Sequence, residues 1–107
     1  MTAPGIPEAL QRKLDTLPEG PGVYLWKDAS GEILYVGKAK RLKSRVRSYF
    51  AADFDASSKN RLLQRLIADV ETIVVPSEPQ SLILENNLIK QYRPRFNVRL
   101  KDDKSYP

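Results

Sequence analysis

The side chains available for chemistry in this chain are carboxylates, tyrosines and cations, because its 107 residues include no His and no Cys. This absence excludes zinc sites of the Cys/His kind, Ser-His-Asp hydrolysis, cysteine nucleophiles and histidine general bases. A divalent metal would be bound by oxygen atoms, which favours magnesium or manganese. A general base would be Tyr, Lys, Asp or Glu.

Glu85 is a carboxylate on the apolar face of a predicted helix. Its neighbours three and four residues away on that face are Ser81, Leu82, Leu88 and Ile89. Burying an unpaired carboxylate costs several kcal/mol, so the side chain must be paired, protonated or bound to a metal. Two interpretations remain open, namely a structural ion pair with a nearby Arg and a metal ligand that faces a cleft.

Tyr24 and Tyr35 lie in two short segments that predict strands, and the turn signal at residues 28–31 between them predicts an antiparallel hairpin. A loop with an even number of residues would pair Tyr24 directly with Tyr35, on one face of the sheet. A three-residue loop with Gly31 in a bulge would break that pairing. Tyrosines in strands are also common core residues, so the convergence of the two hydroxyls stays an expectation.

The segment 38–49 carries six basic residues and no acid. A solvated helix face is one interpretation, but helix surfaces usually mix charges, and a run of this kind is typical of a surface that contacts DNA phosphates. The net charge of +5 agrees with a polyanionic partner. The candidate DNA-binding residues are Lys38, Lys40, Arg41, Lys43, Arg45 and Arg47.

Within this segment, Arg41, Arg45 and Tyr49 are spaced i, i+4 and i+8. This spacing predicts that they share one side of a helix with Leu42. An Arg at the edge of an apolar stripe can be fixed by packing, which suits it to bind one phosphate through two hydrogen bonds.

The elements that must position these residues predict an α+β fold, a small three-stranded antiparallel sheet flanked by helices. Strands are predicted at residues 22–27, 33–37 and 71–75, and helices at 7–17, 41–50 and 77–91. A further helix follows the loop 53–58, with Ser57 or Ser58 as its cap. Its predicted core stripe is Leu62, Leu63, Leu66, Ile67 and Val70.

The last helix has a clear start signal. Ser77 and Gln80 form a predicted capping box, and Pro79 sits in the permissive first turn. The helix is expected to stop before Pro94.

The length suits one domain over residues 1–107, with residues 1–15 as an N-terminal extension bearing the first helix and 98–107 as an extended charged tail. The tail has no closing element, which predicts a fragment of a longer protein. No apolar run is long enough to span a membrane, the N-terminus lacks a signal-peptide apolar region, and no disulfide is possible. We therefore expect a cytoplasmic location.

Gly22-Val23-Tyr24, followed after ten residues by Tyr35-Val36-Gly37, resembles the signature of the GIY-YIG nuclease superfamily, with Val in place of Ile in both halves. Longer stretches are similar to the UvrC nucleases of bacterial nucleotide excision repair, and together the resemblance covers roughly residues 16–107. The similar stretches are 35–42, 47–50, 84–90, 92–97 and 101–107, together with Arg45.

The resemblance implies a three-stranded antiparallel sheet with flanking helices and a DNA endonuclease that cuts the damaged strand on the 3′ side of a lesion. It implies one Mg²⁺ or Mn²⁺ bound by Glu85, double-stranded DNA containing a lesion as substrate, and UvrB as a partner that contacts residues beyond this segment, with UvrA acting upstream. The functional residues of the family fall on Tyr24, Tyr35, Lys38, Arg45, Tyr49, Glu85 and Asn97, each of the expected type.

These positions suggest roles. Arg45 would clamp the scissile phosphate, and Tyr24 would be the general base, its pKa lowered by Lys38 and the metal. Tyr35 can share that role, while Tyr49 and Asn97 would orient the phosphate and the site.

Three alternatives remain open. The first is a DNA-binding module that cuts nothing, and the second is a homing-type or junction nuclease of the same superfamily. The third is an adaptor that docks a partner protein. The module accounts for the charge but not for Glu85 on an apolar face.

Overall fold

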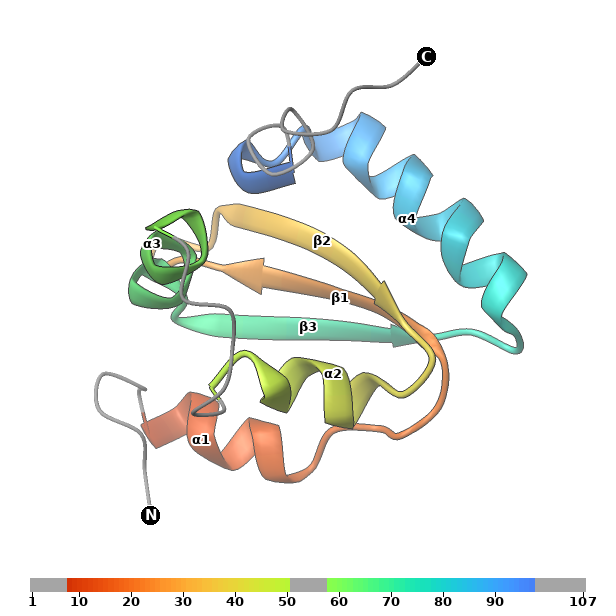
Figure 1. Cartoon of the computed structure of the whole chain (residues 1–107), viewed down its shortest axis with the longest axis horizontal. Helices are drawn as coiled ribbons and strands as arrows, with labels where there is room; N and C mark the ends of the chain where they lie inside the picture. The colour runs from red at the N-terminus through yellow and green to blue at the C-terminus, as the bar shows by residue number, and fades with distance from the viewer. Residues whose placement is uncertain (1–7, 51–57, 98–107) are drawn as a thin grey trace.

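The computed structural model describes residues 8–50 and 58–97 and shows a three-stranded antiparallel sheet in the order β2-β1-β3, flanked by helices (Figure 1). This confirms the predicted α+β class. The predicted tail at 98–107, Ser57 as a cap and most of the loop 53–58 lie outside the described residues. The elements in chain order are α1 (Glu8–Asp15), β1 (Gly22–Lys27), β2 (Ile33–Ala39), α2 (Leu42–Ser48), α3 (Ser58–Leu66), β3 (Asp69–Val74) and α4 (Glu78–Tyr92).

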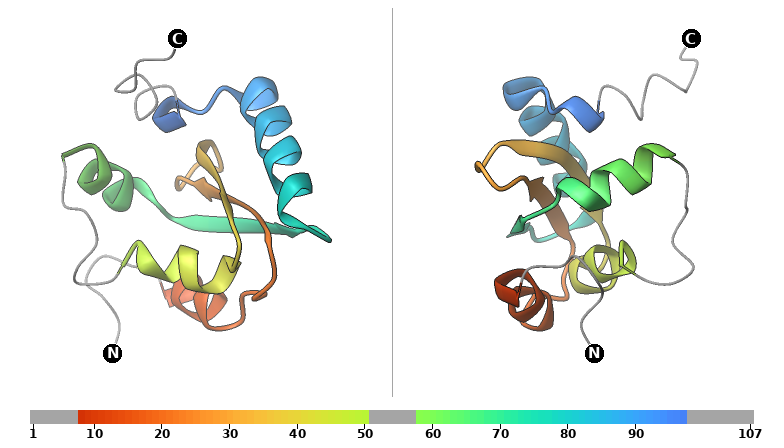
Figure 2. Two further views of the ribbon diagram at one scale, coloured as in Figure 1. Left: turned by 45° about the vertical axis from the view of Figure 1, so that its right-hand side comes forward. Right: turned by 90° about the vertical axis from the view of Figure 1, so that its left-hand side faces the viewer.

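The central strand β1 is buried from Gly22 to Trp26 because both faces of the sheet are covered. One face packs against α1, α2 and α3. The core on this side includes Trp26 of β1, Leu10 of α1 and Val46 of α2. The other face packs against α4. Figure 2 shows α4 on one side of the sheet and α1 with α2 on the other. A continuous apolar strand is what this two-sided burial requires.

The hairpin register differs from the predicted one. Tyr24 pairs with Gly37, and Trp26 pairs with Tyr35. The loop causes the difference, because Gly31 adopts a φ of 91° and the register shifts next to Trp26. The observed pairing is offset by two residues from the predicted one, and alternate residues of a strand share a face. Tyr24 and Tyr35 therefore still lie on the same face, diagonally rather than directly opposite.

The third strand begins two residues earlier than predicted. Asp69 pairs with Lys27 and Val70 with Trp26, and the amide of Ala68 donates a 2.8 Å hydrogen bond to the carbonyl of Lys27. Val70 is therefore a buried strand residue and does not belong to the preceding helix. Of the predicted core stripe, Leu63 and Ile67 are also buried. Pairing with β1 overrode the helical spacing.

The start of α4 is where predicted, but the predicted capping box is absent. Ser77 is the N-cap residue and makes no side-chain capping hydrogen bond, while a proline occupies the first turn as expected. The first turn is exposed, so water can satisfy its free amides. The helix ends at Tyr92, and its C-cap residue Arg93 adopts a left-handed φ of 45°. In the described part of the chain no helix has both the length and the apolar character needed to cross a membrane.

Candidate active site

A cluster of tyrosines forms where β1, β2 and α2 meet. The hydroxyl oxygens of Tyr24 and Tyr49 are hydrogen-bonded at 2.8 Å, and their rings meet edge to face with centroids 5.8 Å apart. The ring of Tyr35 lies 6.2 Å from that of Tyr24. The rings of the two strand tyrosines therefore lie close together, with Tyr49, the C-cap residue of α2, as a third member of the cluster.

Arg45 attaches to this cluster from the side of the solvent. Its Nε donates a long hydrogen bond of 3.4 Å to the Tyr24 hydroxyl, and its guanidinium lies 5.6 Å from the centre of the Tyr49 ring. The predicted i, i+4 contact between Arg45 and Tyr49 is present. Arg41 does not join it on the helix, because Arg41 is the N-cap residue of α2, with an extended backbone at φ −132°.

The three tyrosines differ in their electrostatic surroundings. Burial, with the neighbouring Tyr24 and Glu85, raises the pKa of Tyr35 to about 12. Burial also raises the pKa of Tyr49, with further contributions from Tyr24 and Tyr35. Both hydroxyls therefore stay protonated at neutral pH. The Tyr24 oxygen accepts the hydrogen bond from the cationic N–H of Arg45.

The carboxylate of Glu85 is the buried acid of the site. The residue is 8% exposed on the face of α4 that also buries Ser81, and no cation or hydrogen-bond donor within residues 8–50 and 58–97 pairs with its side chain. Its charge is close enough to Tyr35 to raise the pKa of that hydroxyl. Of the predicted neighbours, Leu88 and Ile89 pack on the sheet, while Leu82 is exposed.

One of the two open interpretations, an ion pair between Glu85 and an Arg, is not present among the described residues. Among the described residues, the buried side-chain polar atom without a partner is Trp26 Nε1, so the Glu85 oxygens, which have no partner there either, are open to solvent and to a cation. The open interpretation of a metal ligand is therefore the one that the described contacts favour.

Asn97 holds the edge strand of the sheet. Its side-chain oxygen accepts a 2.7 Å hydrogen bond from the Val36 amide, and its side-chain nitrogen donates a 2.8 Å hydrogen bond to the Val36 carbonyl. The residue is 1% exposed. Because both polar atoms are occupied by the backbone between Tyr35 and Gly37, Asn97 is placed to fix the tyrosine strand and not to reach a phosphate directly.

A groove of about 790 Å³ runs beside the cluster, between the start of α2 and the first turns of α4. Four of the predicted DNA-binding cations line it, whereas Lys43 and Arg47 do not. Lys38 and Lys40 are exposed on and just after β2. The lining residues on the side of β2 and α2 are Lys38, Ala39, Lys40, Arg41, Ser44, Arg45 and Ser48.

Sequence reasoning missed the opposite wall of this groove and the role of one glycine. Glu78, Pro79, Ser81 and Leu82 of α4 line the groove, and no sequence pattern connects them to the basic segment. A Cβ on Gly37 would lie 2.4 Å from both Cζ and Oη of Tyr24, so the strand can pass the ring because it carries no side chain there. The signal in the sequence that could have indicated this contact is a glycine on one strand of the hairpin at the position that pairs with a tyrosine on the other.

Several known proteins are similar to this chain over most of its length. Residues 20–98 match the family model of the UvrC-like GIY-YIG domain. The UvrABC system protein C of Gemmatimonas aurantiaca is 65% identical over 96 residues, which are 90% of this chain and 16% of that protein. The corresponding protein of Koribacter versatilis is 60% identical over 98 residues, 92% of this chain and again 16% of the relative. The chain thus spans about one sixth of the curated relatives it matches.

Solved structures extend the similarity to the fold. The GIY-YIG N-terminal endonuclease domain of UvrC from Thermotoga maritima, bound to magnesium as its catalytic divalent cation, superposes with a TM-score of 0.75 at 43% identity. The match covers 87% of this chain and all of that domain. A tyrosine-to-phenylalanine variant of the same domain, also bound to its catalytic cation, matches at 42% identity with the same TM-score. On these grounds the chain belongs to the family of UvrC-like GIY-YIG domains.

Proposed function

We propose that this chain is the metal-dependent DNA endonuclease domain of a bacterial UvrC-type protein and hydrolyses a phosphodiester bond on the 3′ side of a lesion in the damaged strand. The observation that carries the proposal is the buried Glu85 carboxylate, which lacks a cation among the described residues and lies near Tyr35. The Thermotoga maritima domain, an endonuclease with a catalytic divalent cation, supports the reaction class.

The donor set fits one hydrated Mg²⁺ or Mn²⁺. Glu85 offers one anionic oxygen ligand, and the described residues hold no group of three or more acidic, His or Cys side chains that would enclose a metal. Magnesium keeps several waters and is commonly bound through one or two carboxylates together with a phosphate oxygen. When bound, the ion would stabilise the charge that develops on the phosphate and on the 3′ leaving oxygen.

Arg45 binds the scissile phosphate in this proposal. The Tyr24 hydroxyl and the Tyr49 ring fix the guanidinium at the edge of the groove, and Nε is already engaged. Its two terminal nitrogens make no hydrogen bond with residues 8–50 and 58–97, and an arginine can hold a phosphate through two hydrogen bonds. Lys38 lines the same groove and adds positive charge beside the phosphate.

In the reacting state of this proposal Tyr24 is a phenolate, which takes the proton from the attacking water and becomes a hydroxyl. The hydrogen bond from Arg45 stabilises negative charge on its oxygen, and Tyr49 shares a 2.8 Å hydrogen bond with the same atom. Tyr35 keeps its own proton at neutral pH, because its pKa is about 12, and acts as a hydrogen-bond donor that orients the water or the phosphate. Asn97 positions Tyr35 indirectly, because its side chain is hydrogen-bonded to the backbone of the next residue, Val36.

The proposal extends to the setting of the reaction. The substrate is double-stranded DNA containing a lesion, delivered by UvrB after UvrA has acted, in the bacterial cytoplasm. The relatives support this setting through their name, UvrABC system protein C. The contacts with UvrB are expected outside these 107 residues.

The decisive test replaces Glu85 with glutamine, which removes the charge and keeps the shape. We expect Glu85→Gln, made in the full-length protein that carries this domain, to lose magnesium-dependent nicking of a lesion-bearing duplex in the presence of UvrA and UvrB, with DNA binding largely retained. Cleavage is followed on a labelled strand, and binding by fluorescence anisotropy. Full incision by this variant in magnesium would overturn the assignment of Glu85 as the metal ligand.

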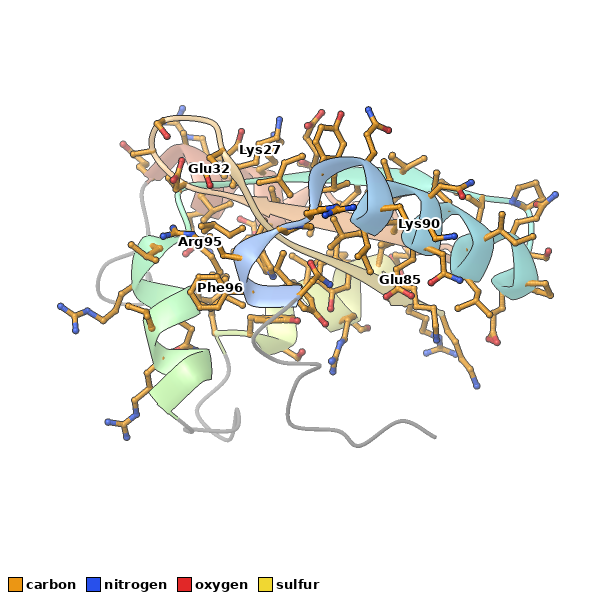
Figure 3. All side chains as sticks on the ribbon, turned by 90° about the horizontal axis from the view of Figure 1, so that it is seen from above. Lys27, Glu32, Glu85, Lys90, Arg95 and Phe96 are labelled. Carbon is orange, nitrogen blue, oxygen red and sulfur yellow. The ribbon has the colours of Figure 1, made fainter. Side chains whose placement is uncertain are left out.

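Glu32→Gln is the matched control, because Glu32 is an exposed acid at the end of the sheet away from Glu85 (Figure 3). It should cleave like the unchanged chain. If the full-length protein that carries this domain binds DNA with UvrA and UvrB present but makes no 3′-side cut with either metal, the domain is a DNA-binding module and the nuclease proposal is wrong.

A further inference from the structure

The groove beside the tyrosine cluster has walls of opposite character. One wall carries Lys38, Lys40, Arg41 and Arg45, and the other is the exposed first turns of α4. Among the residues that line the groove, Glu78 is the one acid. The tertiary fold therefore sets a carboxylate against a basic segment that has none of its own in the sequence.

Glu78 faces Lys40 across the groove. The Nζ of Lys40 lies 3.8 Å from Oε2 of Glu78, and the side chains are 82% and 52% exposed. Glu78 is the first residue of α4, where the helix dipole favours a negative charge. The pair is thus oriented by the helix, yet it is loose and open to water on both sides.

We infer that Glu78 occupies the position beside Lys40 that a DNA phosphate would take. A DNA strand that enters the groove must displace the Glu78 carboxylate. Glu78 thereby weakens the binding of DNA that is held by charge alone. The inference rests on the proposed function, since it takes the groove as the seat of the DNA strand beside the scissile phosphate. Exposed ion pairs are weak, so a phosphate held in place by the rest of the site exchanges with the carboxylate readily. DNA that contacts only the basic wall of the groove gains less binding free energy, because part of the charge of Lys40 is already neutralised by Glu78.

This arrangement has a measurable signature in the salt dependence of binding. A lysine paired with a carboxylate is nearly neutral to an approaching DNA, and it releases little of the counterion atmosphere. A lysine freed from that carboxylate neutralises one more phosphate, which steepens the plot of log affinity against log salt by about 0.9. The expected gain in affinity for Glu78→Gln at low salt is about threefold to fivefold, as befits a weak exposed pair.

The experiment measures binding of a labelled undamaged duplex to the 107-residue chain by fluorescence anisotropy over a series of salt concentrations, in EDTA. The control is Glu8→Gln, which changes net charge equally and also breaks an exposed ion pair, with Arg12 at 3.3 Å. Glu8 begins α1, at the side of the molecule opposite the start of α4 (Figure 1). Thermal unfolding of both variants confirms that the fold is retained.

Tighter binding and a steeper salt slope for Glu78→Gln than for Glu8→Gln support the inference. Equal behaviour of the two variants overturns it, because the effect would then be one of net charge. The absence of binding by any variant at low salt overturns it as well. The binding assay contains no metal, whereas the nuclease proposal is tested by cleavage in magnesium. The two proposals can therefore fail independently.

Discussion

Gly37 and Tyr24 are antiparallel partners in the sheet, and a Cβ on Gly37 would lie 2.4 Å from the Cζ and Oη atoms of Tyr24. The hydroxyl of Tyr24 thus lies against the backbone of β2, while Arg45 of α2 and Tyr49, just after α2, contact the same oxygen. The second glycine of the sequence signature is required because it leaves room for the first tyrosine.

Gly37→Ala is therefore expected to displace the Tyr24 hydroxyl from Arg45 and to reduce cleavage by roughly 100-fold, as misplacement by about 1 Å can do. Overpacking would also destabilise the fold by about 1–3 kcal/mol. Single-turnover cleavage and urea unfolding measure the two effects. Gly20→Ala is the control, because its Cβ would meet Val74 at an ordinary 3.6 Å. Equal cleavage by both variants would show that the Tyr24 position does not limit the reaction.

Asn97→Ala should destabilise the edge strand β2 without changing any tyrosine side chain. It removes both hydrogen bonds to the Val36 backbone and leaves buried groups unpaired, at a cost of about 2 kcal/mol. Hydrogen exchange of the Val36 amide should accelerate, and chemical denaturation should report the loss of stability. Asn87→Ala, on an exposed position of α4, should show neither change. Unaltered exchange at Val36 in Asn97→Ala would contradict a role as edge support.

Arg45→Lys tests whether charge alone suffices at this position. Lysine keeps the cation but loses the planar group that donates to Tyr24 and lies over the Tyr49 ring. We expect a fall in cleavage rate of at least about tenfold, with binding of DNA nearly unchanged. Arg47→Lys is the matched control, because Arg47 is exposed on α2 and does not line the groove. Equal rates for the two variants would remove Arg45 from the phosphate clamp.

The tyrosine cluster should make the fold sensitive to alkaline pH. The pKa of Tyr35 is raised by burial from 10.0 to about 12, so its neutral form is the one that the folded state favours. This contribution is fully present below pH 10 and is lost as the pH rises through 12. Tyr49, whose pKa is also raised by burial, extends the loss in the same direction.

Tyr35→Phe should therefore lose less stability than the unchanged chain between pH 10 and pH 12, measured by urea unfolding. Tyr92→Phe serves as the comparison, because Tyr92 is 49% exposed on α4. A pH profile of Tyr35→Phe that parallels that of Tyr92→Phe would mean that burial of the Tyr35 hydroxyl does not contribute as stated.

The fold class followed from local patterns that depend on neighbours in the chain. Short apolar segments on either side of a turn signal indicated β1 and β2, apolar spacing indicated α1, and the start signal at Ser77 indicated α4. The oxygen-based chemistry followed from the lack of His and Cys, and Glu85 stood out because a charge interrupts an apolar helix face. These properties are set by residue type and spacing, so a sequence alone determines them.

The geometry of the site was decided by contacts between segments far apart in the chain. The hairpin register depended on the backbone of Gly31, and it paired Tyr24 with Gly37 instead of Tyr35. Asn97 acquired its role by docking on Val36, and Glu78 by the packing of α4 opposite the basic segment. Such relations arise when the core closes, because a small change in register or helix placement alters every side-chain distance while leaving the local pattern intact.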